Sequence, residues 1–196
     1  LKRRTLRATY YRKVFNMVLS HPSAFKQPFY VTFDFDDIDK VMEAYESDEK
    51  FSKINFFFCL SFTRKTMEEN DLIYIERKIS NENVNFGIAY NNLTTVYLNE
   101  KIYSRIKVVL LSGQFIDHVL ESFQNESLLD VYTQVANTYH QEIIGLNVKS
   151  FPIYEILNHY NISKLGGVLL TPYVMNDQIT DKSFLKKLKD IEDRKY

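Results

Sequence analysis

The sequence predicts a mixed α/β chain of the α+β class, with an amphipathic N-terminal helix, a central and mainly antiparallel sheet, and a helix-rich C-terminal half. Two observations predict this class. Four β-rich runs follow one another between residues 54 and 98, and beyond residue 112 the apolar spacing becomes helical. The hydrophobic content of 45% and the low counts of 5 Gly and 4 Pro indicate one compact core. We therefore expect a single domain over 1–196, divided into a basic helical leader at 1–28, a β-rich half at 29–112 and a helix-rich half at 113–196.

The N-terminal elements follow from spacing and composition. Over residues 3–19 the apolar side chains recur at nearly helical intervals, and Pro22 ends the helix. Residues 29–35 combine aromatic and β-branched side chains, which predicts a strand. Asp36 or Asp37 is then placed to cap a short helix. A strand-to-helix turn lined with acids is expected here.

The central sheet is predicted as an antiparallel meander. Its four strands are separated by polar turns and cover residues 54–63, 72–79, 84–90 and 93–98. Asn91 and Asn92 are typical of a tight hairpin turn between the last two strands. The first run is apolar almost throughout, so we expect it to be covered on both faces as the central strand.

The C-terminal half alternates strand and helix. We expect a strand at 106–111, helices at 114–124, 127–143 and 152–160, and a last strand at 168–171. A terminal helix is predicted from an apolar stripe formed by Phe184, Leu185, Leu188 and Ile191.

Charge is balanced overall but unevenly distributed. Lys plus Arg and Asp plus Glu each number 25, which removes the simple argument for a nucleic-acid protein from net charge. Residues 1–28 are basic without an acid, whereas 34–50 are strongly acidic. Either the two segments pair or are solvated, or the basic helix binds a protein or nucleic-acid partner. The partner-binding candidates on that helix are Arg3, Arg4, Arg7, Tyr11 and Arg12.

A single cysteine bears on the compartment. Cys59 lies within an apolar run and cannot form an internal disulfide, so we expect a small buried hydrophobe in a cytoplasmic or otherwise intracellular protein. No apolar stretch in the sequence approaches the roughly 20 residues that span a bilayer. We expect a soluble protein without a membrane-spanning segment.

The acidic turn is the most suggestive local feature. An apolar strand carries Asp34 and Asp36 to its carboxyl end, two positions apart, where they could hold a hard cation such as Mg²⁺. One carboxylate could also act as a nucleophile toward phosphate. The simpler interpretation is that one of the two caps the following helix and the other faces solvent.

The segment from Val31 to Ile38 resembles the first motif of the haloacid dehalogenase superfamily of phosphohydrolases. The resemblance implies that Asp34 is the nucleophile and Asp36 the general acid/base. It extends in order to Ser112 at a second strand end, then to a lysine and to a final pair of acids. Those last positions are matched by Lys149 and by Asp177 with Asp181. The resemblance further implies Mg²⁺ held by Asp34, Asp36 and Asp177.

Two other patterns are weaker. Glu76 and Lys78 on one predicted strand could bind a metal and orient a water in a nuclease, although an exposed strand surface is the favoured interpretation. The four histidines lack close metal-ligand spacing, and no glycine-rich phosphate loop occurs. No cofactor is expected outside the Mg²⁺ alternative.

The leading hypothesis from the sequence is a non-catalytic interaction or assembly domain that binds a protein partner. The first alternative is a Mg²⁺-dependent phosphohydrolase that resembles the haloacid dehalogenase superfamily. The second alternative is a nucleic-acid-binding or nuclease domain that uses the basic N-terminal helix. Sheet topology separates these hypotheses, because only a parallel sheet brings the ends of distant strands to one edge.

Overall fold

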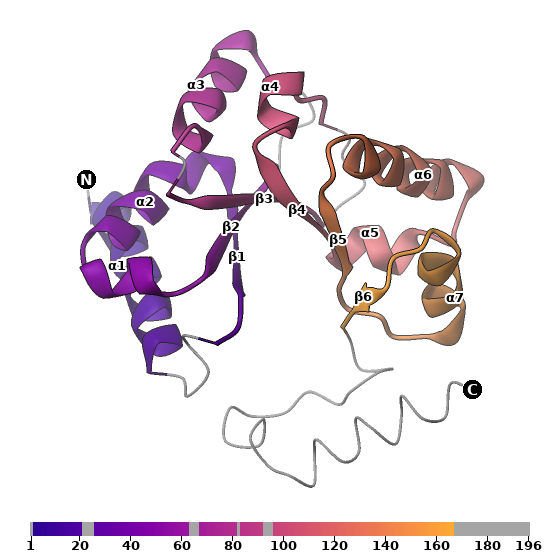
Figure 1. The fold of residues 1–196 in the computed structure, drawn as a ribbon, viewed down its shortest axis with the longest axis horizontal. Coiled ribbons are helices and arrows are strands. Elements are labelled where there is room, and N and C mark those ends of the chain that lie inside the picture. Colours follow the sequence, from indigo (N-terminus) through magenta and orange to yellow (C-terminus); the bar gives the residue numbers. More distant parts are fainter. Residues whose placement is uncertain (1, 21–25, 63–66, 82, 92–95, 167–196) are drawn as a thin grey trace, which may run out of the picture. The chain divides into compact units, whose positions relative to one another are not determined.

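A computed structural model describes residues 2–20, 26–62, 67–81, 83–91 and 96–166 (Figure 1). The strands are β1 Phe29–Asp34, β2 Phe56–Ser61, β3 Asn85–Tyr90, β4 Ile106–Leu111, β5 Glu142–Gly145 and β6 Lys164–Leu165. The α-helices are α1 Lys2–Leu19, α2 Ile38–Glu46, α3 Glu69–Ile79, α4 Glu100–Tyr103, α5 Gly113–His118, α6 Phe123–Thr138 and α7 Phe151–His159. Two 3₁₀ helices, η1 Phe35–Asp37 and η2 Glu49–Lys53, flank α2. None of the helices in these ranges combines the length and apolar content needed to cross a membrane.

The described strands form one six-stranded parallel sheet in the order of the chain, β1 to β6. β1 pairs with β2, β2 with β3, and β5 with β6, each in parallel. The predicted antiparallel meander is therefore wrong, and so is the α+β class. A parallel pair requires a crossover between its strands, and helices supply it here. The fold is of the α/β class.

The element that differs in type from the prediction is α3. Residues 72–79 were expected to form a strand because they are rich in β-branched and aromatic side chains, but they form the last eight residues of a helix. Ile75 and Ile79 are buried one turn apart on its inner face. The Asp71 carboxylate accepts a hydrogen bond from the Glu68 backbone amide at 3.2 Å and closes the N-terminal turn.

The other expected elements differ in outcome. The strands predicted around 29–35, 54–63, 84–90 and 106–111 and the helices at 3–19, 114–124, 127–143 and 152–160 are confirmed with shifted ends. Residues 96–98 are not a strand, and β5 and β6 were not predicted. The second half of the proposed hairpin turn, the strand at 168–171 and the terminal helix lie outside the described residues.

The chain divides into two compact units. The first contains residues 1–90, 94–109 and 136–142, and the second contains 91–93, 110–135 and 143–196. Within the second unit, α5 and α6 meet through Phe115 and Tyr132, whose ring centroids lie 5.4 Å apart.

The core of the first unit is aromatic. Phe15 of α1 is fully buried, and its ring centroid lies 5.1 Å from that of Phe56, 5.4 Å from that of Phe51 and 6.0 Å from that of Phe58. Each such ring removes roughly 150–250 Å² from water, so this cluster docks α1 on the sheet. Since side chains alternate along a strand, the face that carries Phe56 and Phe58 is covered, and Asp34 and Ser61 belong to the opposite face.

Candidate functional site

Asp34 ends β1 and begins the turn into η1. Its Oδ1 accepts a hydrogen bond from the Asp36 backbone amide at 3.0 Å and thereby caps the 3₁₀ helix. Its Oδ2 is buried and has no hydrogen-bond partner in the described part of the chain. A buried carboxylate oxygen without a partner costs free energy, so it is either strained or awaits a ligand. This oxygen is the clearest sign of a site in the first unit.

Ser61 lies beside Asp34, because the parallel register pairs the two positions at the ends of β1 and β2. Ser61 is 7% exposed, and its hydroxyl donates to the Phe33 carbonyl oxygen at 3.1 Å. Ser61 is not among the site residues predicted from the sequence. The signal was present, since Ser61 is the first polar residue after the apolar run of β2, as Asp34 is after that of β1.

Asp37 has a structural role. Its carboxylate, 6% exposed, accepts a hydrogen bond from the Tyr11 hydroxyl at 3.4 Å and forms an ion pair with Lys40. These contacts join α1 to the start of α2. Tyr11, a candidate for partner binding, is therefore buried against the chain's own acidic turn.

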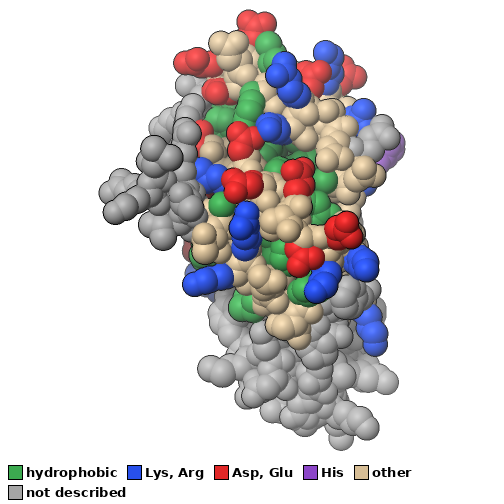
Figure 2. All heavy atoms as spheres, turned by 90° about the vertical axis from the view of Figure 1, so that its left-hand side faces the viewer, with side chains coloured by type: hydrophobic (Ala, Val, Ile, Leu, Met, Phe, Trp, Pro, Cys, Tyr) green, Lys and Arg blue, Asp and Glu red, His purple; other side chains and the backbone are tan. Residues whose placement is uncertain are grey.

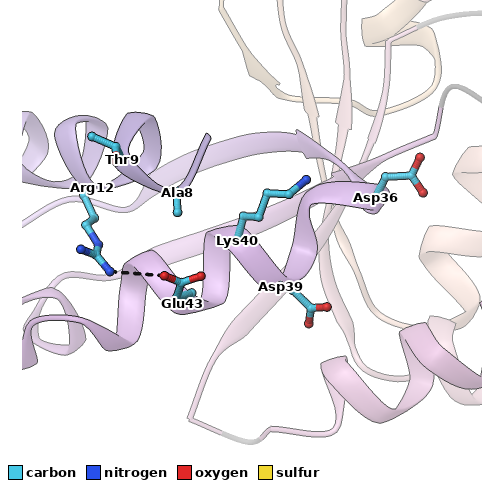
Figure 3. Close-up of a pocket in the computed structure, with 7 residues that line it drawn as sticks. All are labelled: Ala8, Thr9, Arg12, Asp36, Asp39, Lys40 and Glu43. Carbon is cyan, nitrogen blue, oxygen red and sulfur yellow. Dashed lines mark hydrogen bonds and ion pairs between the residues drawn. The ribbon is translucent and has the colours of Figure 1, made fainter. Parts of the chain in front are cut away.

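A groove of about 410 Å³ lies between α1 and the segment that contains η1 and α2. Figure 3 shows Arg12 of α1 joined to Glu43 of α2 across it, with Asp36 at the far end from that pair. The Arg12 Nη2 atom lies 3.4 Å from Glu43 Oε1. The charge of Arg12 is thus shared with an acid of the 34–50 segment.

The surface of this side of the molecule mixes both signs of charge. Figure 2 shows Lys and Arg side chains interspersed with Asp and Glu. The Arg12–Glu43 pair confirms that the basic and acidic segments make an ion pair. Arg3, Arg4 and Arg7 lie on α1, but their side chains are outside the described part of the structure. Binding of a protein or nucleic-acid partner through this helix stays a prediction.

The proposed nuclease pair is contradicted by α3. Glu76 and Lys78 lie two residues apart on a helix, where side chains at that spacing do not face each other. Glu76 pairs with Lys101 at 3.2 Å, and Lys78 pairs with Asp39 at 2.5 Å. Their roles are ion pairs that connect α3 to α4 and to α2.

The remaining candidates lie in the second unit or outside the description. Ser112 precedes α5, and its side chain makes no capping hydrogen bond. The Lys149 ammonium lies 2.9 Å from Asp117 Oδ1 and 3.2 Å from Oδ2, so its described partner is Asp117. Asp177 and Asp181 fall among the residues that the structure does not describe.

The described residues do not bring together the donors of a metal centre. Among the described residues, no three His, Cys, Asp or Glu side chains gather closely enough to hold a metal ion. Asp34 offers one uncommitted oxygen, and its sheet neighbour Ser61 offers a hydroxyl already bonded to the backbone. A Mg²⁺ site at Asp34, Asp36 and Asp177 stays a prediction of the sequence.

No protein-family model and no curated protein matches the chain, whereas solved structures do match. The EAL domain of Mycobacterium smegmatis DcpA aligns with a TM-score of 0.65 and 10% identity, over 91% of this chain and 85% of that one. The PaMucR phosphodiesterase in complex with c-di-GMP aligns with a TM-score of 0.59 and 14% identity. The alignment covers 90% of this chain and 72% of that one. A standalone EAL protein of Vibrio cholerae O395 with bound c-di-GMP aligns with a TM-score of 0.58 and 10% identity. The alignment covers 88% of this chain and 74% of that one.

These similarities establish the fold, which is EAL-like and related to the TIM barrel. They correct the resemblance to the haloacid dehalogenase superfamily, because the structural neighbours are EAL-domain proteins. They equally contradict the three functional hypotheses drawn from the sequence, namely the interaction domain, the Mg²⁺-dependent phosphohydrolase and the nucleic-acid domain. Short motifs of single acids, a serine and a lysine do not encode strand direction, so they do not separate one α/β fold from another.

Proposed function

We propose that this chain binds cyclic di-GMP at the carboxyl ends of β1 and β2, with Asp34 as the residue that recognises guanine. The observation that carries the proposal is the buried, unpartnered Oδ2 of Asp34 at that edge of the sheet. In TIM-barrel-like folds ligands bind at the carboxyl ends of the strands. EAL-like structures that share this fold have been solved with c-di-GMP bound.

The chemistry of guanine suits this position. The Watson–Crick edge of guanine presents two neighbouring donors, N1–H and the N2 amino group, and an ionised carboxylate is an acceptor for both. Asp34 already uses Oδ1 to cap η1, which holds the side chain in one orientation. The unpartnered Oδ2 is then the atom left to accept from the base, which reaches it once the groups that cover it move aside.

Binding, and no hydrolytic step, is proposed. One structural neighbour was solved as a calcium and cyclic di-GMP complex. Among the described side chains of this chain, no three His, Cys, Asp or Glu gather closely enough to hold a cation. The proposal includes the intracellular location that the single cysteine predicts.

Isothermal titration calorimetry with cyclic di-GMP, in buffer with and without EDTA, tests the proposal. We expect saturable binding that EDTA does not change, and at least about tenfold weaker binding by Asp34→Asn, since a charged acceptor becomes in part a donor. Asparagine is as good an N-cap as aspartate, so the variant should keep the turn. Asp36→Asn is the matched control and should bind within about twofold of the unmodified chain.

Three results would contradict the proposal. The unmodified chain does not bind cyclic di-GMP, or Asp34→Asn binds as well as the unmodified chain does, or cyclic di-AMP, whose adenine lacks both donors, binds equally well. Chromatography of the same mixtures adds a fourth, because appearance of a linear dinucleotide would replace binding alone by phosphodiester hydrolysis.

A further inference from the structure

A second cavity lies at the amino-terminal ends of the strands in the first unit. It has a volume of about 240 Å³ and is lined by residues that include Tyr45, Lys53, Asn55, Asn83 and Asn85. At about 30 Å³ per water molecule, this volume corresponds to about eight waters, which leaves room for a small hydrated ion. Asn55 immediately precedes β2, and its carbonyl oxygen accepts from the Phe29 amide that opens β1 at 2.9 Å.

A chain of hydrogen bonds orients the amides of this cavity. The Lys107 ammonium can only donate, and it donates to Asn85 Oδ1 at 2.6 Å. The Asn85 amide nitrogen, Nδ2, therefore faces the other way and donates to Asn55 Oδ1 at 3.1 Å. Asn55 is left with its own Nδ2 amide as the group it can offer a ligand. The positive charge of Lys107, at the start of this chain of hydrogen bonds, strengthens the Asn55 donor at its end.

The other polar groups of the cavity have the same character. Lys53 is exposed and has no ion-pair partner among the described residues. Burial raises the pKa of the Tyr45 phenol, so it remains an O–H donor at physiological pH. No Asp or Glu occurs among the described residues that line the cavity. The lining therefore combines one ammonium with several neutral donors.

We infer that this cavity is a binding site for a small oxyanion, the chemistry shared by phosphate and sulfate, held by Lys53 and by the outward amide of Asn55. Amide and hydroxyl donors together with one cation are the groups that hold oxyanions at protein surfaces. The site is independent of the cyclic di-GMP proposal, because it lies at the opposite ends of the strands.

Titration with inorganic phosphate, followed by two-dimensional ¹⁵N NMR at constant ionic strength, tests the site. We expect saturable shifts of the backbone amides at 52–56, 83 and 85. Lys53→Gln should weaken the affinity roughly fivefold to tenfold, which is the worth of one charge-assisted contact. Lys50→Gln, on the same 3₁₀ helix but outside the lining, is the matched control and should change the affinity by less than about twofold.

Asn55→Asp is the second variant. It keeps the shape and the acceptor for Asn85 but replaces the outward donor by an anionic oxygen, so saturable shifts should vanish while the rest of the spectrum is unchanged. The inference is overturned if phosphate produces no saturable shifts at these amides. Equal losses in Lys53→Gln and Lys50→Gln would also overturn it, because they would indicate only a general attraction of anions.

Discussion

At the scale of single residues, Asp39 shows how charge joins two helices. It lies on α2 and accepts hydrogen bonds from Lys78 and Tyr74 of α3, and the bond from Lys78 is the largest cause that lowers the pKa of Asp39. Burial, together with the bond to Asp39, raises the pKa of Tyr74. The Lys78 ammonium also lies 5.5 Å from the centroid of the Tyr74 ring. The three side chains therefore form one local network.

This network predicts a pH-dependent contribution of Asp39 to stability. A carboxyl whose pKa is lowered in the folded state stabilises the fold at pH values above its unfolded-state pKa, near 3.8. This stabilisation is lost as the pH falls through the folded-state pKa. Asp39 is largely exposed, so we expect Asp39→Asn to lower the free energy of unfolding by less than about 1 kcal/mol at neutral pH. Urea unfolding at neutral pH and well below pH 3.8 measures the difference, which should vanish in acid.

Lys78→Met provides the control for this prediction. In that background Asp39→Asn should have little effect at any pH, because the main partner is absent. A deficit that is the same with and without Lys78 would contradict the assignment.

Cys59 and the strand-end residues show what sequence resolves at this scale. Cys59 is fully buried as expected, and burial raises the pKa of its thiol to about 12. Asp34 was predicted at a strand end and lies there. The position of Ser61 beside Asp34 and the lack of a partner for Asp34 Oδ2 both depend on the register between β1 and β2. This register cannot be predicted from the sequence of either strand alone.

At the scale of elements, Gly87 shows how closely β3 and β4 approach. A Cβ atom at Gly87 would lie 2.6 Å from Val108 Cγ1, 2.8 Å from Cys59 Sγ and 3.0 Å from the Val108 carbonyl oxygen. The last of these atoms belongs to the backbone and cannot rotate away. Only a residue without a side chain leaves the neighbouring strands their spacing.

We therefore expect Gly87→Ala to lower the free energy of unfolding by about 1–3 kcal/mol, as overpacking in a core does. Denaturant unfolding with an unchanged slope measures it. Gly166→Ala is the matched control, since its Cβ would meet only Leu146 Cδ2 at 3.5 Å, and it should change stability by less than about 0.5 kcal/mol. Equal unfolding midpoints for the two variants would refute the close approach.

The type of an element was predicted correctly where its composition and its apolar spacing indicated the same secondary structure. The apolar runs of β2 and β4 and the helical spacing of α1 and α2 gave the right type. α3 did not, because its residues satisfy the composition of a strand while Ile75 and Ile79 satisfy the spacing of a helix. The short strands β5 and β6 are too brief for any periodicity.

At the scale of the whole molecule, strand direction determines which parts can stand alone. In an antiparallel meander, residues 54–98 would be a self-contained sheet. The described residues of this segment contribute two strands to the sheet, β2 and β3, a parallel pair connected through α3, and β2 takes its other partner from β1. Without α1, Phe15 no longer packs on Phe56 and Phe58. The apolar face of β2 is then exposed to water.

A peptide of residues 54–98 is accordingly expected to be unfolded in water, because its two strands and α3 lack β1, the other partner of β2, and α1, whose Phe15 covers the aromatic face of β2. Far-ultraviolet circular dichroism during heating measures this, with the full chain as the folded control. A β-sheet spectrum that melts cooperatively in the isolated peptide would contradict the parallel topology.

The sequence by itself determined which segments are buried and the type of most elements, because burial leaves a local period of 2 or 3.6 in the apolar residues. It also placed Asp34 at the end of a strand. Only the tertiary structure decided that the strands run parallel, that residues 69–79 are a helix, and that Asp34 and Ser61 share one edge. The physical reason is that direction and register depend on where the chain passes between strands, and the free energy of those pairings comes from residues far apart in the sequence.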